Sequence, residues 1–464
     1  MSSSAQDTGI SAEAAGSRGN SANCLLVSAN RMVLPYPVYP LGIAHIIGAL
    51  RDKGHRAEHL DILASGGLGP LEKRLRENRY DVIGVSIRNI DTVDSTSPLE
   101  LLSDITEVVT CIRQHSQAPL VLGGPGFSIM PERLLAHLRA DYGIIGEGEE
   151  AFPQLIEKIM AGERPRQRLF SKNLAVFPDC RPGYSPEVAP YYVSHGGMLN
   201  IQTKRGCTYG CSYCSYPTIE GKKLRYRDPL LVVEEVERLS RQFGARYIFF
   251  TDAVFNDPGN HYLEIAERLA QAGNKTPWCA FFRPQDISTE TLRLLKKSGM
   301  AAMELGTDAT TDTTLAGLRK GFTFDEVMKV NEKIIAESIP CAHFVMFGGP
   351  DETEETVLQG LANLERLRQT VIFTYIGIRI LPGTGMHQRA LADGLVFSDT
   401  DLITPLFYYS PLVTREFIDH QLRLSFGRRK DRVFPVSERE HLIAMLHQMG
   451  QVGPLWDLLI DKCL

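Results

Sequence analysis

Three cysteines lie within eight residues, and their spacing is the most informative feature of the sequence. Cys207, Cys211 and Cys214 follow the pattern Cys-x3-Cys-x2-Cys, and an aromatic residue, Tyr213, precedes the third. Three thiolates can hold three irons of a [4Fe-4S] cube and leave the fourth iron open. Structural metal sites close themselves with a fourth protein ligand, whereas an open position is available for chemistry. The spacing therefore predicts a reactive iron–sulfur cluster.

A zinc knuckle or a chance cluster of core thiols is the alternative interpretation. Zinc prefers four ligands, and the next cysteine or histidine after Cys214 is the distant His261. The remaining cysteines are scattered singly, most of them in apolar contexts typical of buried free thiols: Cys24, Cys111, Cys180, Cys279, Cys341 and Cys463. This usage indicates a reducing cytoplasm rather than a disulfide-stabilised secreted protein.

Length and composition are those of an ordinary globular enzyme. The 464 residues suffice for two or three domains, and the net charge of -5 argues against a dedicated nucleic-acid binder. No apolar run approaches the roughly 18 residues of a membrane span; the longest, at 41–50, contains His45 and fits a buried helix. Residues 1–22 are rich in Ser, Ala and Gly without an apolar segment, which predicts a disordered tail and no signal peptide.

Residues 23–162 alternate short apolar strands with helical patterns. Strands are expected at 24–28, 56–61, 81–86, 120–124 and 142–145, with helices between them. Repeated β-α units of this length predict a doubly wound, mostly parallel Rossmann-like sheet that binds ligands at the carboxyl ends of its strands. Gly123 and Gly124 end the fourth strand, where missing side chains let a large planar ligand approach the backbone.

A second α/β domain is expected after a linker at 163–198. The strand 199–203 leads into the cysteine loop, and further strands are expected at 247–251, 278–282, 301–305, 343–347 and 373–380. Six such units predict a partial (β/α)6 barrel over residues 199–390, with its site at the carboxyl ends of the strands. Asp252, Glu304 and Asp308 are acids at or near those ends.

The C-terminal region, residues 391–464, has a different character. It contains an aromatic run at 406–409, a basic run at 423–432 and an apolar helix at 438–449. We expect a small helical cap that closes the mouth of the barrel and keeps a reactive intermediate dry. The basic run is usually a solvated helix face; the alternative is a contact for an anionic substrate or a redox partner.

The motifs of residues 199–390 resemble those of the radical S-adenosylmethionine (SAM) superfamily. Besides the cysteines, residues 249–255 are similar to the family's second-strand segment, with Ala253 in place of a second acid. Residues 304–308 with 315–322, residues 347–353 and residues 381–385 are similar to the fourth-, fifth- and sixth-strand motifs. Four such matches in chain order are not expected by chance.

This resemblance implies that SAM chelates the open iron and that the reduced cluster cleaves it to a 5′-deoxyadenosyl radical. Asp252 would then meet the SAM ammonium, and a cation at Arg319 or Lys320 the carboxylate. The alternatives are that Asp252 and Asp308 cap the following helices and that the two cations form a solvated helix end. The implied SAM-binding set is Tyr213, Asp252, Glu304, Asp308, Arg319, Gly348, Gly349 and Pro350.

Residues 23–162 look like the cobalamin-binding domain that precedes the barrel in one large subfamily. The matching segments are 40–44, 122–125 and 146–149. The Asp-x-His-x-x-Gly motif is absent, so the resemblance implies base-off cobalamin without a histidine ligand. Arg88 and Asn89 would face the cobalt from below, or only order the loop that leads to Asp91. The implied cobalamin-binding set is Arg88, Asn89, Gly123, Gly124, Gly146 and Glu147. An acyl- or nucleotide-binding domain would share the same periodicity. Arg225 and Arg227, after the cysteines, would touch SAM or the cobalamin amides, or pack their own loop.

Overall similarity is closest to the lipid and natural-product branch of this subfamily. It implies a cytoplasmic, cobalamin-dependent methyltransferase that acts on an unactivated carbon of a small, lipid-like or natural-product precursor. A flavodoxin or ferredoxin would supply electrons, and no nucleic acid or transmembrane segment is involved. One alternative is a radical rearrangement or cyclisation without methyl transfer. Another is an iron–sulfur electron-transfer or sensor protein, against which the intact SAM motifs count.

Overall fold

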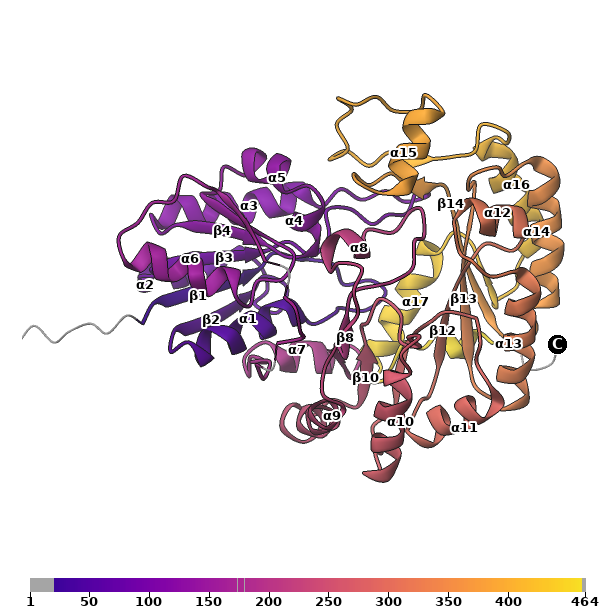
Figure 1. Cartoon of the computed structure of the whole chain (residues 1–464), viewed down its shortest axis with the longest axis horizontal. Coiled ribbons are helices and arrows are strands. Elements are labelled where there is room, and N and C mark those ends of the chain that lie inside the picture. The colour runs from indigo at the N-terminus through magenta and orange to yellow at the C-terminus, as the bar shows by residue number, and fades with distance from the viewer. Residues whose placement is uncertain (1–20, 173, 179, 461–464) are drawn as a thin grey trace, which may run out of the picture.

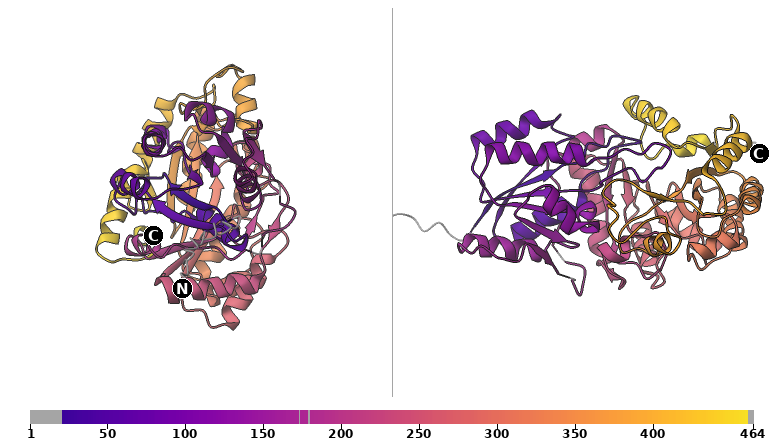
Figure 2. Two further views of the ribbon diagram at one scale, coloured as in Figure 1. Left: turned by 90° about the vertical axis from the view of Figure 1, so that its left-hand side faces the viewer. Right: turned by 90° about the horizontal axis from the view of Figure 1, so that it is seen from above.

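The chain forms two α/β domains that lie side by side along its long axis (Figures 1 and 2). The computed structural model describes residues 21–172, 174–178 and 180–460. Nearly all of the expected N-terminal tail, residues 1–20, lies outside the described residues.

The first domain is built on one parallel sheet with the strand order β2-β1-β3-β4-β5-β6. Its strands are β1 (Asn23–Ser28), β2 (Arg56–Asp61), β3 (Val82–Ser86), β4 (Leu120–Gly123), β5 (Tyr142–Ile145) and β6 (Leu169–Ser171). Because alternate strand residues point to opposite faces, the sheet has two apolar cores. One core packs under α2 (Leu68–Glu77), α3 (Leu102–His115) and α5 (Pro131–His137), and the other under α1 (Leu41–Asp52) and α6 (Ala151–Met160).

The doubly wound sheet expected from the sequence is confirmed. Its sixth strand, β6, falls within the expected linker. This strand has only three residues at the sheet edge, too few to show an alternating hydrophobic pattern in the sequence. Short helices complete the domain and the linker: α4 (Pro125–Ile129) and α7 (Ala189–Ser194).

The second domain is an open barrel with the strand order β7-β10-β11-β12-β13-β14-β17, all parallel. Its strands are β7 (Met198–Ile201), β10 (Tyr247–Phe250), β11 (Trp278–Phe282), β12 (Met303–Asp308), β13 (Cys341–Phe347), β14 (Val371–Ile376) and β17 (Arg432–Val433). The connections are α9 (Pro229–Phe243), α10 (His261–Gln271), α11 (Thr289–Lys297), α12 (Asp312–Gly317), α13 (Phe324–Ala336) and α14 (Glu354–Arg366).

The expected fold class is therefore confirmed, with one strand more than expected. β17 has only two residues and no sequence signature of its own. It is held at the barrel edge because the buried Arg432 guanidinium donates to the carbonyl oxygens of Leu364, Leu367 and Thr370.

The C-terminal region adds further helices around the barrel, and the cap over its mouth stays a prediction. Helix α16 (Arg415–Phe426) packs outside the barrel near α14, and α17 (Ser437–Gln448) follows β17. The short helix η1 (Trp456–Leu459) packs among side chains at the beginnings of the strands, such as Met198 and Tyr247. It closes the amino-terminal end of the barrel, opposite the mouth.

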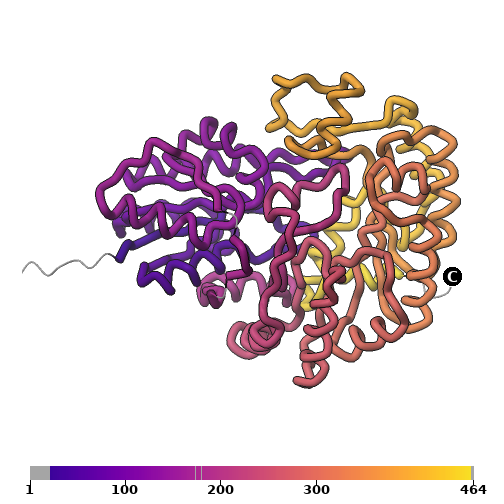
Figure 3. Tube along the Cα trace, viewed as in Figure 1, coloured from indigo at the N-terminus to yellow at the C-terminus, as the bar shows by residue number. Residues whose placement is uncertain are grey.

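A loop of the first domain fastens the two domains together. The segment after β3 reaches the barrel at β14 (Figures 1 and 3). There the buried carboxylate of Asp91 pairs with the Arg379 guanidinium at 2.8 Å, and the Ser95 hydroxyl donates to the Ile376 carbonyl oxygen. Arg415 in turn donates to the Ser95 carbonyl oxygen at 3.1 Å. These buried contacts fix the carboxyl ends of both sheets relative to each other.

Candidate functional site

The three cysteines lie on a loop between the short strand β8 (Lys204–Arg205), which follows β7, and the short helix α8 (Tyr216–Ile219), at the carboxyl end of the barrel. Gly206 opens the loop with φ +91°, and a Cβ there would lie 2.2 Å from the Lys223 carbonyl oxygen, so only glycine fits. Ser212 donates its N–H to the Leu318 carbonyl oxygen at 3.0 Å and accepts from the Met386 N–H. The loop is thereby tied to the segments that follow β12 and β14.

The thiols of this loop suit a cluster with three protein ligands. Cys207 is buried, Cys211 and Cys214 are partly exposed, and all three are free. Burial raises the pKa of Cys214 to about 12, and the neighbouring Cys211 and Cys207 add to the effect. Within the described part of the chain, no three His, Cys, Asp or Glu side chains are arranged to hold a single metal ion. A cubane cluster instead binds each thiolate to a separate iron.

An acid, a cation and a phenol meet directly beside the cysteines. The Tyr213 hydroxyl donates to the Asp308 carboxylate, which also pairs with the Lys320 ammonium. Burial lowers the pKa of the Lys320 ammonium, but the nearby Asp308 carboxylate raises it, and the net pKa lies above the usual value. Of the two cations singled out in the sequence, Lys320 is inside the site, whereas Arg319 is exposed with φ +56°. Asp308 is the last residue of β12 and does not begin α12, so it caps no helix.

Arg283, directly after β11, is a site residue that the sequence reasoning missed. Its buried guanidinium lies over the Tyr209 ring at 4.1 Å and the Phe322 ring at 4.7 Å. Tyr209 belongs to the cysteine loop, and Phe322 follows Lys320. An arginine at the end of a barrel strand was the available signal.

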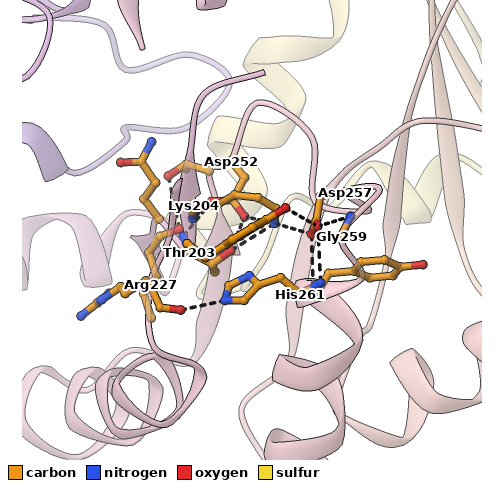
Figure 4. A network of polar contacts seen from close by, with 12 residues as sticks. Thr203, Lys204, Arg227, Asp252, Asp257, Gly259 and His261 are labelled. Carbon is orange, nitrogen blue, oxygen red and sulfur yellow. Dashed lines mark hydrogen bonds and ion pairs between the residues drawn. The ribbon is translucent and has the colours of Figure 1, made fainter. Parts of the chain in front are cut away.

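Asp252 holds the start of the cysteine loop, as Figure 4 shows. Its carboxylate accepts from the N–H groups of Thr203 and Lys204 at 2.7 and 3.2 Å and from the Lys204 ammonium at 2.9 Å. The same ammonium lies 3.5 Å from Asp257, and all three side chains are at most 1% exposed. Asp252 therefore caps no helix, and its oxygens are already engaged by the chain itself.

The other expected SAM contacts are spread along the barrel. The N–H groups of Gly348 and Gly349 donate to the Glu352 carboxylate, which shapes the turn that Pro350 continues. Glu304 lies four residues before Asp308 on β12, about 13 Å along the strand. It accepts from the Trp456 indole N–H at 3.0 Å inside the barrel, apart from the Asp308 cluster.

A cavity of about 400 Å³ lies between the two domains, next to the cysteine loop. It is lined by five of the six residues expected to bind cobalamin, namely Arg88, Gly123, Gly124, Gly146 and Glu147; Asn89 is not among its walls. From the barrel side Arg205, Tyr216, Phe249 and Phe281 face it. Gly124 has φ +96°, and a Cβ there would lie 2.6 Å from the Ile87 carbonyl oxygen.

One end of this cavity enters the first domain between its sheet and helices α1 and α6. Leu26, Gly84 and Phe152 line it, and a Cβ on Gly84 would lie 2.9 Å from the Leu26 side chain. His45 of α1 is 2% exposed here, and neither ring nitrogen has a hydrogen-bond partner among the described residues. Burial, with the Arg205 cation, lowers the pKa of His45 to about 3, so the ring is neutral. Because buried polar groups in proteins are nearly always paired, these nitrogens indicate a bound polar group.

The two arginines after the cysteines are engaged in ion pairs. Arg225 pairs with Glu147 of the first domain, and Arg227 with Glu235 of α9. Arg205, two residues before Cys207, reaches Glu149 of the first domain at 2.6 Å. Of the interpretations left open, the structure therefore shows packing of the loop and of the domain junction.

No described helix has both the length and the apolar character that crossing a membrane requires.

Comparisons with known proteins agree with this two-domain site. Residues 201–362 match the family "Radical SAM superfamily", and residues 27–156 match "B12 binding domain". The tryptophan 2-C-methyltransferase of Streptomyces laurentii is 24% identical over 77% of this chain and 72% of its own length.

Solved structures share the architecture. The radical SAM methyltransferase TsrM from Kitasatospora setae superposes with a TM-score of 0.84 at 23% identity, over 95% of this chain and 97% of its own. The cobalamin-dependent radical enzyme OxsB superposes with a TM-score of 0.69 at 15% identity, over 92% of this chain and 72% of its own. At these identities the likeness establishes the fold.

Fold and site together define a protein that pairs a cobalamin-type Rossmann domain with a cysteine-bearing partial barrel. The chain carries a B12-binding domain followed by a radical SAM domain. The resemblance seen in the sequence is thus confirmed; the individual ligand assignments stay predictions.

Proposed function

We propose that the protein is a cobalamin-dependent radical SAM methyltransferase. The observation that carries the proposal is the cavity between the domains, which lies beside the cysteine loop and opens toward the barrel strands. The similarity to TsrM, a methyltransferase described with cobalamin and a [4Fe-4S] cluster, supports the same assignment. When bound, the cluster supplies the electron that cleaves SAM, and cobalamin carries the methyl group.

Cys207, Cys211 and Cys214 hold the [4Fe-4S] cluster in this proposal. Tyr213, Asp308 and the turn of Gly348, Gly349 and Pro350 orient SAM, and Lys320 and Arg283 face its carboxylate. Burial of both cations supports this role, whereas the exposed Arg319 has less support than Lys320. Asp252 acts through the Lys204 backbone by holding the loop, and Glu304 belongs to the barrel interior.

Arg88, Gly123, Gly124, Gly146 and Glu147 hold cobalamin. The glycine turns would let the corrin ring approach the backbone, and the part of the cavity beside His45 would take its nucleotide tail. Arg88 lines the cavity and forms no ion pair with any described residue, which supports a role for it in holding the cofactor. The histidines of the first domain supply no cobalt ligand in this proposal.

The substrate is a small lipid-like or natural-product precursor, and a flavodoxin or ferredoxin supplies electrons. The protein works in the cytoplasm, a compartment that suits its thiols: every cysteine among the described residues is free.

Anaerobic purification followed by iron and cobalamin quantitation tests the assignment, together with mass spectrometry of products from methyl-labelled SAM. We expect one [4Fe-4S] cluster and one cobalamin per chain, formation of 5′-deoxyadenosine, and label on cobalamin. Cys211→Ala should lose the iron, whereas Cys24→Ala, a buried lone thiol of β1, should keep it. Retained cluster iron in Cys211→Ala, or loss of corrinoid on desalting, refutes the proposal. An electron-transfer or sensor protein would bind the cluster without turning over SAM.

A further inference from the structure

Phenylalanines line one level of the barrel interior. Since alternate strand residues point inward, β10, β11, β13 and β14 place Phe249, Phe281, Phe344 and Phe373 on the same wall. Neighbouring rings are in contact: their centroids are 5.4 Å apart for Phe249 and Phe281, 5.9 Å for Phe281 and Phe344, and 5.2 Å for Phe344 and Phe373. The interior thus presents a continuous aromatic surface.

This surface borders an open space. Phe281 is 37% exposed although β11 is flanked by β10 and β12, so its exposed face is turned into the barrel. Phe249 and Phe281 also line the cavity between the domains. On β12, a Cβ added to Gly306 would meet only the Phe282 carbonyl oxygen, at 3.8 Å. The space is therefore continuous with the site proposed for cobalamin.

A buried carboxyl group faces this aromatic wall. Glu304 of β12 pairs in register with Phe281 and is 3% exposed. Its only hydrogen bond to a described residue comes from the Trp456 indole. Burial raises the pKa of Glu304 to about 7. A carboxyl group with one partner keeps further acceptor capacity on its other oxygen.

The floor of the space limits what can enter. Trp456 and Leu459 of η1 pack between the beginnings of the strands and close that end. A long alkyl chain that enters from the cavity would have no exit there. Aromatic rings, in contrast, gain from edge-to-face and offset contacts with phenylalanines beyond the area they bury.

We propose that the barrel interior binds a planar aromatic substrate whose N–H or O–H group donates a hydrogen bond to Glu304. The inference rests on the proposed function, because it assigns that enzyme's substrate class. It narrows the small-molecule precursor to an aromatic one and makes Glu304 its recognition residue.

Binding calorimetry on the full chain loaded with cluster and cobalamin tests this with indole, its isostere benzofuran, and 1-octanol. Benzofuran has the same shape as indole but lacks the N–H. We expect indole to bind about tenfold more tightly than benzofuran, since a hydrogen bond to a buried acid is worth about 1.4 kcal/mol or more. Octanol should bind most weakly.

Variants separate the two parts of the site. Glu304→Gln should reduce the preference for indole to about twofold or less, because an amide oxygen is a weaker acceptor than a carboxylate. Phe281→Leu should weaken indole and benzofuran alike by about tenfold. Phe397→Leu, at a residue 69% exposed, is the matched control and should change neither. Unchanged far-ultraviolet circular dichroism and cobalamin content establish that each variant is folded.

Three results would overturn the inference: octanol binding more tightly than indole, indole binding that is indifferent to Phe281→Leu, or a preference for indole that persists in Glu304→Gln. Its failure is distinguishable from failure of the proposed function. Protein that methylates its cobalamin from SAM but binds no aromatic probe refutes the substrate class alone. Protein that binds indole but retains no cobalamin refutes the methyltransferase alone.

Discussion

Replacing Asp252 by Asn should destabilise the barrel, because the buried Lys204 ammonium then loses the carboxylate closest to it. Asn keeps an oxygen that can accept from the N–H groups of Thr203 and Lys204, which lie 2.7 and 3.2 Å from the carboxylate. It removes the negative charge 2.9 Å from the Lys204 ammonium, and Lys204 is 1% exposed. Breaking a buried ion pair from one side typically costs about 3–5 kcal/mol. Because Asp257 remains 3.5 Å away, we expect the lower end, about 3 kcal/mol.

A second change should recover most of this loss. In the double variant Asp252→Asn with Lys204→Met, no buried cation remains, and Asp257 keeps the hydrogen bonds that the Tyr226 hydroxyl and the Gly259 N–H donate to its carboxylate. The double variant should therefore unfold at higher denaturant concentration than the single one. Asp325→Asn breaks the exposed pair with Lys329 and is the matched control, for which we expect no measurable change.

Tryptophan fluorescence of the cluster-free protein in urea measures these differences. Both tryptophans of the chain, Trp278 in β11 and Trp456 in η1, pack inside the barrel, so their emission reports on the domain that carries Asp252. SAM affinity is measured separately on cluster-loaded protein. If Asp252→Asn unfolds like the wild type while SAM binds at least tenfold more weakly, the loop-holding role is wrong and Asp252 is a direct SAM ligand.

Further predictions concern the other buried groups. His45→Phe should weaken hydroxocobalamin binding about fivefold in equilibrium dialysis, because one neutral hydrogen bond is lost. The binding of cobinamide, which lacks the nucleotide tail, should not change; equal losses for both ligands would contradict a contact with the tail. Arg283→Met should weaken SAM binding about tenfold in calorimetry without loss of iron, since charge-assisted contacts to a carboxylate are lost; a loss of iron would instead make Arg283 part of the loop's support. The pKa of Glu304 rises from 4.5 to about 7 on folding, so the folded state binds the proton more tightly than the unfolded state. The stability of the wild type relative to Glu304→Gln should therefore fall by about 3 kcal/mol between pH 4.5 and 7 in urea titrations, and it should stay level above pH 7. A stability difference that does not depend on pH would show that the carboxyl is not buried in this way.

The order of strands and the cysteine loop could be predicted from the sequence because both depend on residues that are close together along the chain. Strands of buried parallel sheets are short apolar runs, and the three cysteines lie within eight residues of one another. Glu304 and Asp308 share a strand and a motif, yet the structure gives them different surroundings. The indole that donates a hydrogen bond to Glu304 belongs to Trp456, 152 residues away, and no local sequence pattern predicts such a contact. Asp252 was placed correctly at a strand end, but its partner Lys204 is joined to it only by the pairing of β7 with β10.

The same long-range contacts connect the cysteine loop with the cavity between the domains, which the sequence could only place separately. Arg205 stands two residues before Cys207 and pairs with Glu149 of the first domain at 2.6 Å, while its neighbour Lys204 is held by Asp252. The turn that leads into the cysteine loop is therefore fixed on one side by the barrel and on the other by the wall of the cavity between the domains. A displacement of either domain would move the first cysteine. The buried charges at this junction thus set the distance between the cluster and the cavity, which a reaction shared between the two sites requires to be constant.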